Sequence, residues 1–191
     1  MPSGAPVKAH SFHVLACAAL ITLTGVACTP MPTEPLAEKL DLNTGTTVAV
    51  ASKPLELIAD KTRGTARDPF AYIGPFETNK QGEKHLYIWI AAPQDKGQIL
   101  EPTLYCDDRA LKFEPINKSM KEIGLSSQPY KKAAPWAIQW FYHLSEDNLI
   151  CLAEAKRVAL ITERKSGKQV QETFSAEGEE LKLIAAFAAS R

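Results

Sequence analysis

The chain has 191 residues, of which 45% are hydrophobic and 23% are charged. Its 22 Lys and Arg residues balance 22 Asp and Glu residues, so the formal net charge is zero. The length predicts one domain with or without appendages, the hydrophobic content argues against a disordered chain, and the balanced charge argues against a protein that binds nucleic acid.

The N-terminal segment is nearly uncharged and contains a short apolar run. Residues 9–33 contain no Asp, Glu, Lys or Arg, and residues 14–27 are mostly apolar. A membrane-spanning helix needs about 20 apolar residues, so this run is short for an anchor. Its length is typical of the middle of a secretory signal, with Lys8, His10 and His13 as the basic leader. An internal apolar helix is the alternative.

Small residues precede a cysteine at the end of this run, because Gly25, Val26 and Ala27 stand directly before Cys28. The segment resembles a bacterial lipoprotein signal, which is cleaved before a cysteine that then carries lipid. Ala27 and Cys28 match that pattern, whereas Gly25 departs from it, since an aliphatic residue usually stands there. Cys17 is a rival match, but no apolar run would precede a cut at that position. An ordinary signal peptide cut near Ala27 is the alternative.

The resemblance implies a location as well as a modification. It makes residues 1–27 a signal peptide and Cys28 the site of acylation. In this family an Asp after the cysteine tends to retain the protein in the inner membrane, and Thr29 stands there instead. The resemblance therefore implies a lipid anchor in the outer membrane, facing the periplasm, with the inner membrane or the cell surface as alternatives.

Prolines follow the lipid-carrying cysteine. Pro30 and Pro32 oppose helix and sheet, because proline lacks an amide hydrogen and has a fixed φ. The pattern predicts an extended tether over residues 28–43, with a short helix from Pro35 to Leu42 as an option. Residues 44–191 are then a single periplasmic domain.

Two cysteines remain once the signal is removed and Cys28 is acylated, namely Cys106 and Cys151. The periplasm oxidises thiols, so an even remainder predicts a disulfide between them. Two separately buried thiols are the alternative. A metal site is not predicted, because C-x-x-C is absent and the mature chain contains only His85 and His143 as histidines.

The mature domain is predicted to be mostly β, of the α+β class. Alternating or β-branched apolar residues predict about nine strands. These strands cover residues 46–51, 55–59, 70–77, 84–92, 99–106, 110–113, 136–144, 158–164 and 169–174. Two short helices are predicted, one from about Ser145 to Lys156 and one over about 179–189. This order favours an antiparallel, β-sandwich-like domain covered by the helices, one of which the disulfide would pin onto the sheet.

Three local patterns refine this interpretation. Residues 84–92 are apolar on both strand faces, which predicts a strand that is covered on both sides. Gly74 and Pro75 suggest a bulge or bend at a sheet edge. Residues 107–109 resemble a tight turn, which favours turn formation over acid–base chemistry for the adjacent carboxylates Asp107 and Asp108.

Motifs of catalysis are absent from the sequence: there is no G-x-S-x-G, H-E-x-x-H, P-loop or G-x-G-x-x-G. His85 and His143 are interpreted as surface or rim residues. The three tryptophans fall at strand spacing and are interpreted mainly as core. We therefore expect no cofactor and no enzymatic activity.

One segment has no obvious structural purpose. Residues 114–135 form a long connection between strands, in which Tyr130, Lys131 and Lys132 stand between prolines. A semi-rigid loop with an aromatic and two cations is a reasonable binding surface. A variable surface connection is the alternative.

The leading hypothesis is a non-enzymatic outer-membrane lipoprotein that binds a protein or glycan partner in the envelope or serves a larger assembly. The first alternative is a lysozyme inhibitor. Residues 104–108, with Leu111 and Phe113, faintly resemble the start of the small lipoprotein inhibitors of c-type lysozyme, but the Ser-Gly-x-Arg-Tyr loop of that family is absent. The second alternative is an envelope hydrolase.

Overall fold

The computed structural model describes residues 36–60, 70–93, 98–116, 119–131, 137–166 and 168–191. Strands dominate this part of the chain, and two α-helices accompany them, so the predicted mostly-β α+β class is confirmed. Cys28 and Lys132 lie outside the described residues, as do the predicted signal peptide and the first half of the predicted tether.

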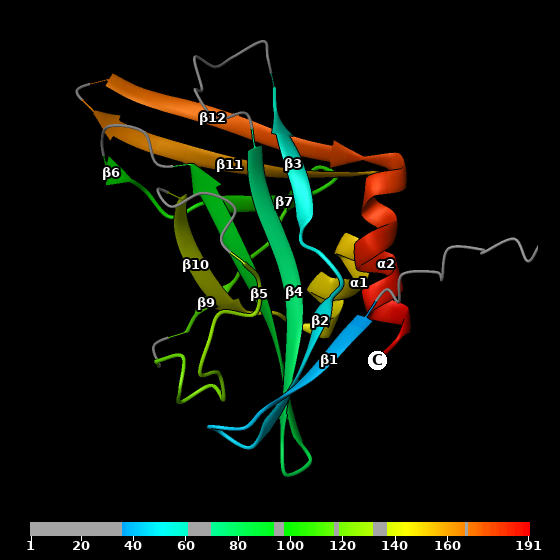
Figure 1. Ribbon diagram of the computed structural model, residues 1–191. Coiled ribbons are helices and arrows are strands. Elements are labelled where there is room, and N and C mark those ends of the chain that lie inside the picture. Colours follow the sequence, from blue (N-terminus) through cyan, green and yellow to red (C-terminus); the bar gives the residue numbers. More distant parts are fainter. Residues whose placement is uncertain (1–35, 61–69, 94–97, 117–118, 132–136, 167) are drawn as a thin grey trace, which may run out of the picture. The chain divides into compact units, whose positions relative to one another are not determined.

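The described strands form one continuous sheet (Figure 1), in which every pair is antiparallel. The strands are β1 (Leu36–Asp41), β2 (Thr46–Ala51), β3 (Leu55–Ala59), β4 (Phe70–Lys80), β5 (Glu83–Pro93), β6 (Gln98–Ile99), β7 (Thr103–Cys106), β8 (Arg109–Ala110), β9 (Glu114–Pro115), β10 (Ala137–His143), β11 (Arg157–Ser166) and β12 (Lys168–Glu177). The main path runs β8-β7-β11-β12-β3-β4-β5-β10-β9, while β2 joins β1 to β4 and β6 pairs with β11.

The sheet curls until its two ends come close together. β8 and β9 lie at opposite ends of the main path, yet only residues 111–113 separate them along the chain. Among the described strands, no pairing joins β7 to β10 across this gap. We call the gap between β7 and β10 the seam.

Two helices pack against each other and cover one side of the sheet (Figure 1). Helix α1 (Glu146–Glu154) begins after Ser145, whose hydroxyl accepts a hydrogen bond from the Asn148 amide at 3.2 Å, as expected for an N-cap. A short 3₁₀ turn, η1 (Gly178–Leu181), leads into α2 (Lys182–Ala189). The helices bury their apolar residues in the same core as the sheet.

The structure contains the predicted disulfide. Cys106 ends β7 and Cys151 lies in α1, and their Cα atoms are 6.1 Å apart. Forty-five positions separate the two cysteines in the sequence. As predicted, the bridge therefore fastens a covering helix to the sheet.

The first strand differs from the sequence interpretation. Residues 36–41 form β1, which pairs with β2 from Leu36 opposite Ala51 to Asp41 opposite Thr46. The optional helix from Pro35 to Leu42 is therefore wrong, and the described end of the predicted tether belongs to the folded domain. Pairing with β2 satisfies backbone groups of both strands, which local propensity alone does not anticipate.

Strand β5 is covered on both faces, as predicted. Ile88 and Ile90 point to one face and Trp89 to the other, and all three are fully buried. The first face also carries Glu77 of β4, which binds the Arg191 side chain after α2, so this is the face toward the helices. A loop covers the second face.

Candidate functional site

The loop that covers the second face of β5 comprises residues 119–131, which we call the cover. Ile123, Leu125 and Tyr130 are its buried side chains, with exposures of 6%, 2% and 4%. The predicted role of Tyr130 as an exposed contact residue is therefore wrong. Its ring lies 5.4 Å from the ring of Trp89, centroid to centroid, inside the protein.

Gly74 explains why Tyr130 can be buried at this place. A Cβ atom at Gly74 would lie only 2.3 Å from a carbon of the Tyr130 ring, so no larger residue fits beneath the ring. The Tyr130 hydroxyl donates to the carbonyl of Pro75 and accepts from the Ala51 amide at 3.0 Å. Burial raises the pKa of this hydroxyl, which therefore remains a donor.

The Gly74–Pro75 position is a junction within β4 rather than an outer edge of the sheet. On one side β4 pairs with β5 without interruption. On the other side β4 pairs with β3 up to Ile73 and with β2 from Phe76 onward. The Tyr130 hydroxyl bridges β2 and β4 where their pairing ends, and Pro75 has no N–H group that would need a partner there.

Hydrogen bonds from the β1–β2 turn hold the other end of the cover. The Asp41 carboxylate accepts from the Ser126 amide at 2.6 Å, and the Thr44 hydroxyl donates to the Gly124 carbonyl at 2.7 Å. The hydrogen bond from the Ser126 side chain is the largest cause that lowers the pKa of Asp41, and the one from the Ser126 amide is the next. Of the predicted binding residues, the structure thus places Tyr130 inside and Lys131 at the surface, while Lys132 lies outside the described residues.

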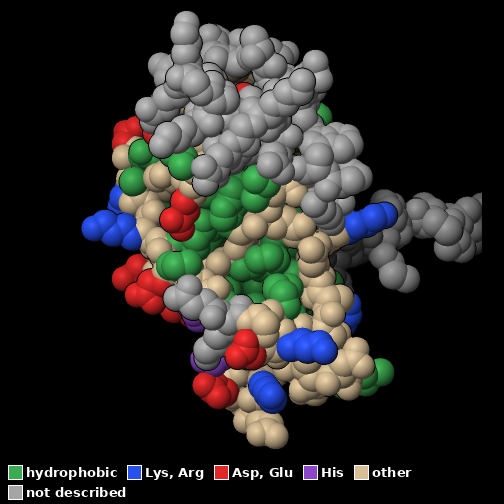
Figure 2. All heavy atoms as spheres, turned by 90° about the vertical axis from the view of Figure 1, so that its left-hand side faces the viewer, with side chains coloured by type: hydrophobic (Ala, Val, Ile, Leu, Met, Phe, Trp, Pro, Cys, Tyr) green, Lys and Arg blue, Asp and Glu red, His purple; other side chains and the backbone are tan. Residues whose placement is uncertain are grey.

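A second region, the seam, contains a cleft of about 420 Å³. Its lining comprises Glu101, Pro102, Thr103, Leu111, Lys112, Phe113 and Tyr142. The cleft lies beside β10, and Figure 2 faces the side of the domain with β6, β9 and β10, where hydrophobic side chains gather in a hollow. Apolar and polar side chains share this lining about equally, with Leu111, Phe113 and the Tyr142 ring beside Glu101, Thr103 and Lys112.

Tyr142 is the most unusual residue of the cleft. Its side chain is 3% exposed, and the Phe113 ring stacks on it at 5.5 Å. The Tyr142 hydroxyl is buried, and no described residue offers it a hydrogen bond of good geometry. Burial is the largest cause that raises the pKa of Tyr142, and the charge of Glu101 and a poorly aligned hydrogen bond between the two side chains raise it further. The cleft therefore contains a protonated hydroxyl with unused hydrogen-bonding capacity.

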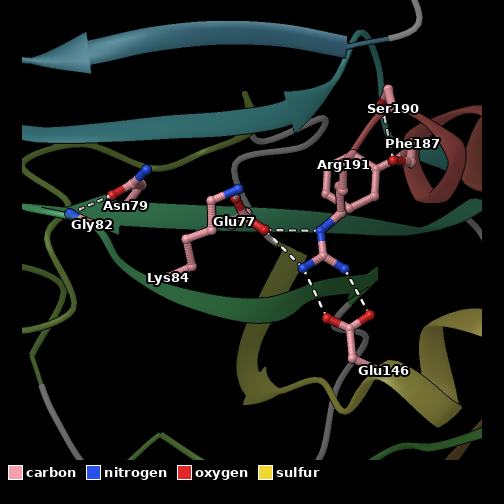
Figure 3. Close-up of polar contacts among 8 residues, drawn as sticks. All are labelled: Glu77, Asn79, Gly82, Lys84, Glu146, Phe187, Ser190 and Arg191. Atoms are coloured by element: carbon pink, nitrogen blue, oxygen red, sulfur yellow. Dashed lines mark hydrogen bonds and ion pairs between the residues drawn. The ribbon is translucent and has the colours of Figure 1, made fainter.

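A charged network lies elsewhere, between the sheet and the helices (Figure 3). The buried Glu77 carboxylate contacts the Lys84 ammonium at 3.0 Å and the Arg191 guanidinium at 2.8 Å, and Arg191 also forms two 2.9 Å hydrogen bonds with Glu146. Burial alone would raise the pKa of Glu77, but the hydrogen bonds from Lys84 and Arg191 outweigh it and lower the pKa. This network links β4, β5, α1 and the end of α2, so its role is structural.

Asp107 forms the predicted tight turn. Its carboxylate accepts hydrogen bonds from the Lys156 and Arg157 amides at 3.0 and 2.9 Å, and its φ of 50° fits the turn between β7 and β8. The interpretation as a turn former is confirmed for Asp107, while Asp108 is exposed. This turn lies within the stretch that resembles the lysozyme inhibitors, and there Leu104 and Cys106 are buried.

His85 and His143 lie at the surface, as interpreted. His85 contacts Glu83 at 2.9 Å, and His143 lies against the ring of Tyr87. In the described part of the chain, no cluster of three or more His, Cys, Asp or Glu side chains could hold a metal ion. Trp89 is core, as interpreted, and its indole N–H donates to Gln139 at 2.8 Å.

The sequence does not single out the cleft residues Glu101 and Tyr142, and Phe113 enters only through the resemblance to the lysozyme inhibitors. Tyr142 lies in an alternating strand pattern like its neighbours, and Glu101 has no distinctive neighbours in the sequence. These residues lie together because the two ends of the curled sheet approach each other at the seam without pairing. No local signal in the sequence could have identified them.

The sequence matches no family model, and comparison with curated proteins and with solved structures gives no match. Over the residues that the structure describes, none of the helices has the length and apolar character needed to cross a membrane.

Proposed function

We propose that this chain is a lipid-anchored protein of the bacterial outer membrane whose periplasmic domain has a non-enzymatic binding or accessory role. The apolar run before Cys28 supports the lipid anchor. The disulfide between Cys106 and Cys151 supports an oxidising compartment, since such bridges persist outside the cytosol. The partner is an envelope protein or glycan.

The seam cleft is the observation that carries the binding role. At the seam a space of about 420 Å³ remains open beside Phe113 and Tyr142, whereas the open space next to Leu55 of β3 is about 210 Å³. A concavity in which apolar side chains meet convergent polar groups is a candidate binding site. The site offers contact area and hydrogen bonds.

Site-specific crosslinking in intact cells tests this proposal. A photoreactive amino acid in place of Lys112, which is exposed at the cleft, should capture an envelope partner. The same amino acid in place of Glu83, exposed in the distant β4–β5 turn, is the matched control. Capture from both positions alike, or from neither, would contradict a binding role for the cleft.

The anchor has a separate test. Palmitate labelling of the protein should disappear in Cys28→Ser, and the protein should move from the membrane to the soluble fraction. Three acyl chains tether a protein almost permanently, since each buried CH₂ contributes about 0.8 kcal/mol. Labelling that persists in Cys28→Ser would refute acylation at this cysteine.

A further inference from the structure

We infer that the seam cleft binds an amphipathic group of the envelope partner, with an apolar body and an ammonium head, and that Tyr142 and Glu101 receive this head. The inference deepens the proposed binding role of the cleft and rests on it. It names the chemistry of the ligand, which neither the fold nor the sequence resemblance supplies.

The first step is the unused capacity of the Tyr142 hydroxyl. The great majority of buried side-chain polar atoms in proteins have a well-formed hydrogen bond, so a buried hydroxyl whose contact with Glu101 falls short of good geometry needs a reason. Tyr130 shows what the same chain does with a structural tyrosine, because its hydroxyl both donates and accepts. Tyr142 is as deeply buried but lines a cavity. A ligand group in the cleft would supply the missing partner.

The second step concerns the charge of that group. The Glu101 carboxylate lies in the same lining, close enough to act on the Tyr142 hydroxyl, and a carboxylate only accepts hydrogen bonds. An ammonium can donate to Glu101 and to the Tyr142 oxygen at once, whereas an anionic head would meet a like charge. Glu101 and Lys112 are both exposed, so water and salt screen both charges, and Glu101 is the one of the two that acts on the Tyr142 hydroxyl.

The third step concerns the body of the ligand. Leu111 is buried in the floor of the cleft, and Pro102 and Phe113 add apolar surface. The cavity volume of about 420 Å³ falls within the range of small-molecule sites, which is about 300–1,000 Å³. It accommodates one ring or a short alkyl chain in addition to the head group.

Three probes with one ring each separate the possible head groups. Phenethylamine carries an ammonium, 2-phenylethanol a neutral hydroxyl and phenylacetate a carboxylate. Each is titrated by NMR against the full chain carrying Cys28→Ser, which leaves every described residue unchanged. We expect the amine to bind with a dissociation constant about tenfold or more below that of the carboxylate, because charge-assisted hydrogen bonds are the stronger ones.

Two substitutions test the residues. Tyr142→Phe removes only the hydroxyl and should weaken amine binding by about tenfold, and Glu101→Gln should weaken the amine but not the alcohol. Tyr105→Phe, a half-buried tyrosine on β7 that is not part of the cleft lining, is the matched control and should change neither. Tyr142→Phe should also leave the denaturation midpoint unchanged or raise it, because it removes a buried group without a partner.

Two outcomes would overturn the inference. If phenylacetate binds as well as phenethylamine, or if the amine does not bind at about 10 mM, the cleft does not take an ammonium head. If Tyr142→Phe lowers the denaturation midpoint while amine binding is unchanged, the hydroxyl serves the fold and not a ligand. Neither outcome affects the crosslinking test, so failure of the ligand class can be distinguished from failure of the binding role.

Discussion

The cover and the cleft treat two buried tyrosines in opposite ways. Tyr130 and Tyr142 have nearly the same exposure, 4% and 3%. The hydroxyl of Tyr130 is held by the Ala51 amide and the Pro75 carbonyl, whereas no described residue completes a hydrogen bond to the hydroxyl of Tyr142. Burial alone therefore does not show whether the hydroxyl of a tyrosine has well-formed hydrogen bonds.

The difference between the two tyrosines follows from how each part of the sheet is covered or closed. Between β2, β4 and β5 the outer face is closed by the cover, and Tyr130 bridges two strands where their pairing ends. Between β7 and β10 the sheet is not closed by pairing, and a cavity remains. In the cover the side chains are packed, whereas the cleft keeps open apolar and polar groups that a ligand can contact.

The largest expected effect is on the cover. Tyr130→Ala should lower the free energy of unfolding by about 5 kcal/mol, because it opens a large cavity and leaves the Ala51 amide and the Pro75 carbonyl without their partner. Urea denaturation followed by circular dichroism measures the loss. Tyr105→Ala, a half-buried residue of β7, is the control and should cost much less. Equal costs for the two variants would show that the cover does not stabilise the sheet.

Removing the disulfide should have the next largest effect. Cys106 and Cys151 are 45 positions apart, and chain-entropy estimates give roughly 4 kcal/mol for a loop of this length before strain. The double variant Cys106→Ala, Cys151→Ala should show this loss in denaturant titrations. Reduction of the unmodified protein should lower its denaturation midpoint in the same way and leave that of the double variant unchanged.

The bridge also links the stability of the seam to redox conditions. It holds α1 against β7, and β7 forms one side of the seam. Phenethylamine binding should therefore weaken in the double variant even where most of the protein is folded. Unchanged affinity would show that the cleft does not depend on the bridge.

Most of the strands could be predicted from the sequence because their signal is local. The period-two pattern over residues 137–143 and the paired runs on either side of Gly167 locate β10, β11 and β12 in the chain. The disulfide could be predicted because only two cysteines remained to pair. The strand β1 could not, since four of its six residues, from Ala37 to Leu40, are exposed and its identity depends on the edge of β2.

The sites were harder to predict because they depend on contacts between distant residues. Tyr130 looks like an exposed loop residue until Gly74, far away in the chain, provides the space for its ring. The cleft depends on a pairing that does not form between β7 and β10, and sequence patterns report strands rather than their partners. Both sites depend on which distant segments contact each other, and local sequence patterns do not show this.

The charged network should make stability depend on pH. The pKa of Glu77 in the folded protein lies below its usual value of 4.5. Its contribution is therefore fully present above that usual value and is lost as the pH falls through the lower, folded-state pKa. Glu77→Gln should cost about 2 kcal/mol at pH 7, because hydrogen bonds to charged groups are lost.

The unmodified protein and Glu77→Gln should approach the same free energy of unfolding in acid. Denaturation at pH values from 7 to 3 measures the free energy of unfolding of each, and the difference between them should shrink below about pH 4.5. Glu83→Gln, at an exposed carboxylate that contacts His85, is the control and should change little. A difference that persists undiminished at pH 3 would mean that the Glu77 charge is not what stabilises the network.

The smallest expected effect concerns the outer side of the cover. Lys131 follows the buried Tyr130 directly and is exposed, so Lys131→Ala should change the free energy of unfolding by less than about 0.5 kcal/mol. Because Lys131→Ala hardly changes stability, this variant tests the predicted binding loop directly. Tyr130→Ala would not, since a loss of binding could then result from unfolding. If partner capture in the envelope weakens in Lys131→Ala, and more at low salt where charges are least screened, the cover contributes a cation to the partner surface. If capture is unchanged while substitutions in the cleft abolish it, the cover serves the fold and the seam alone binds.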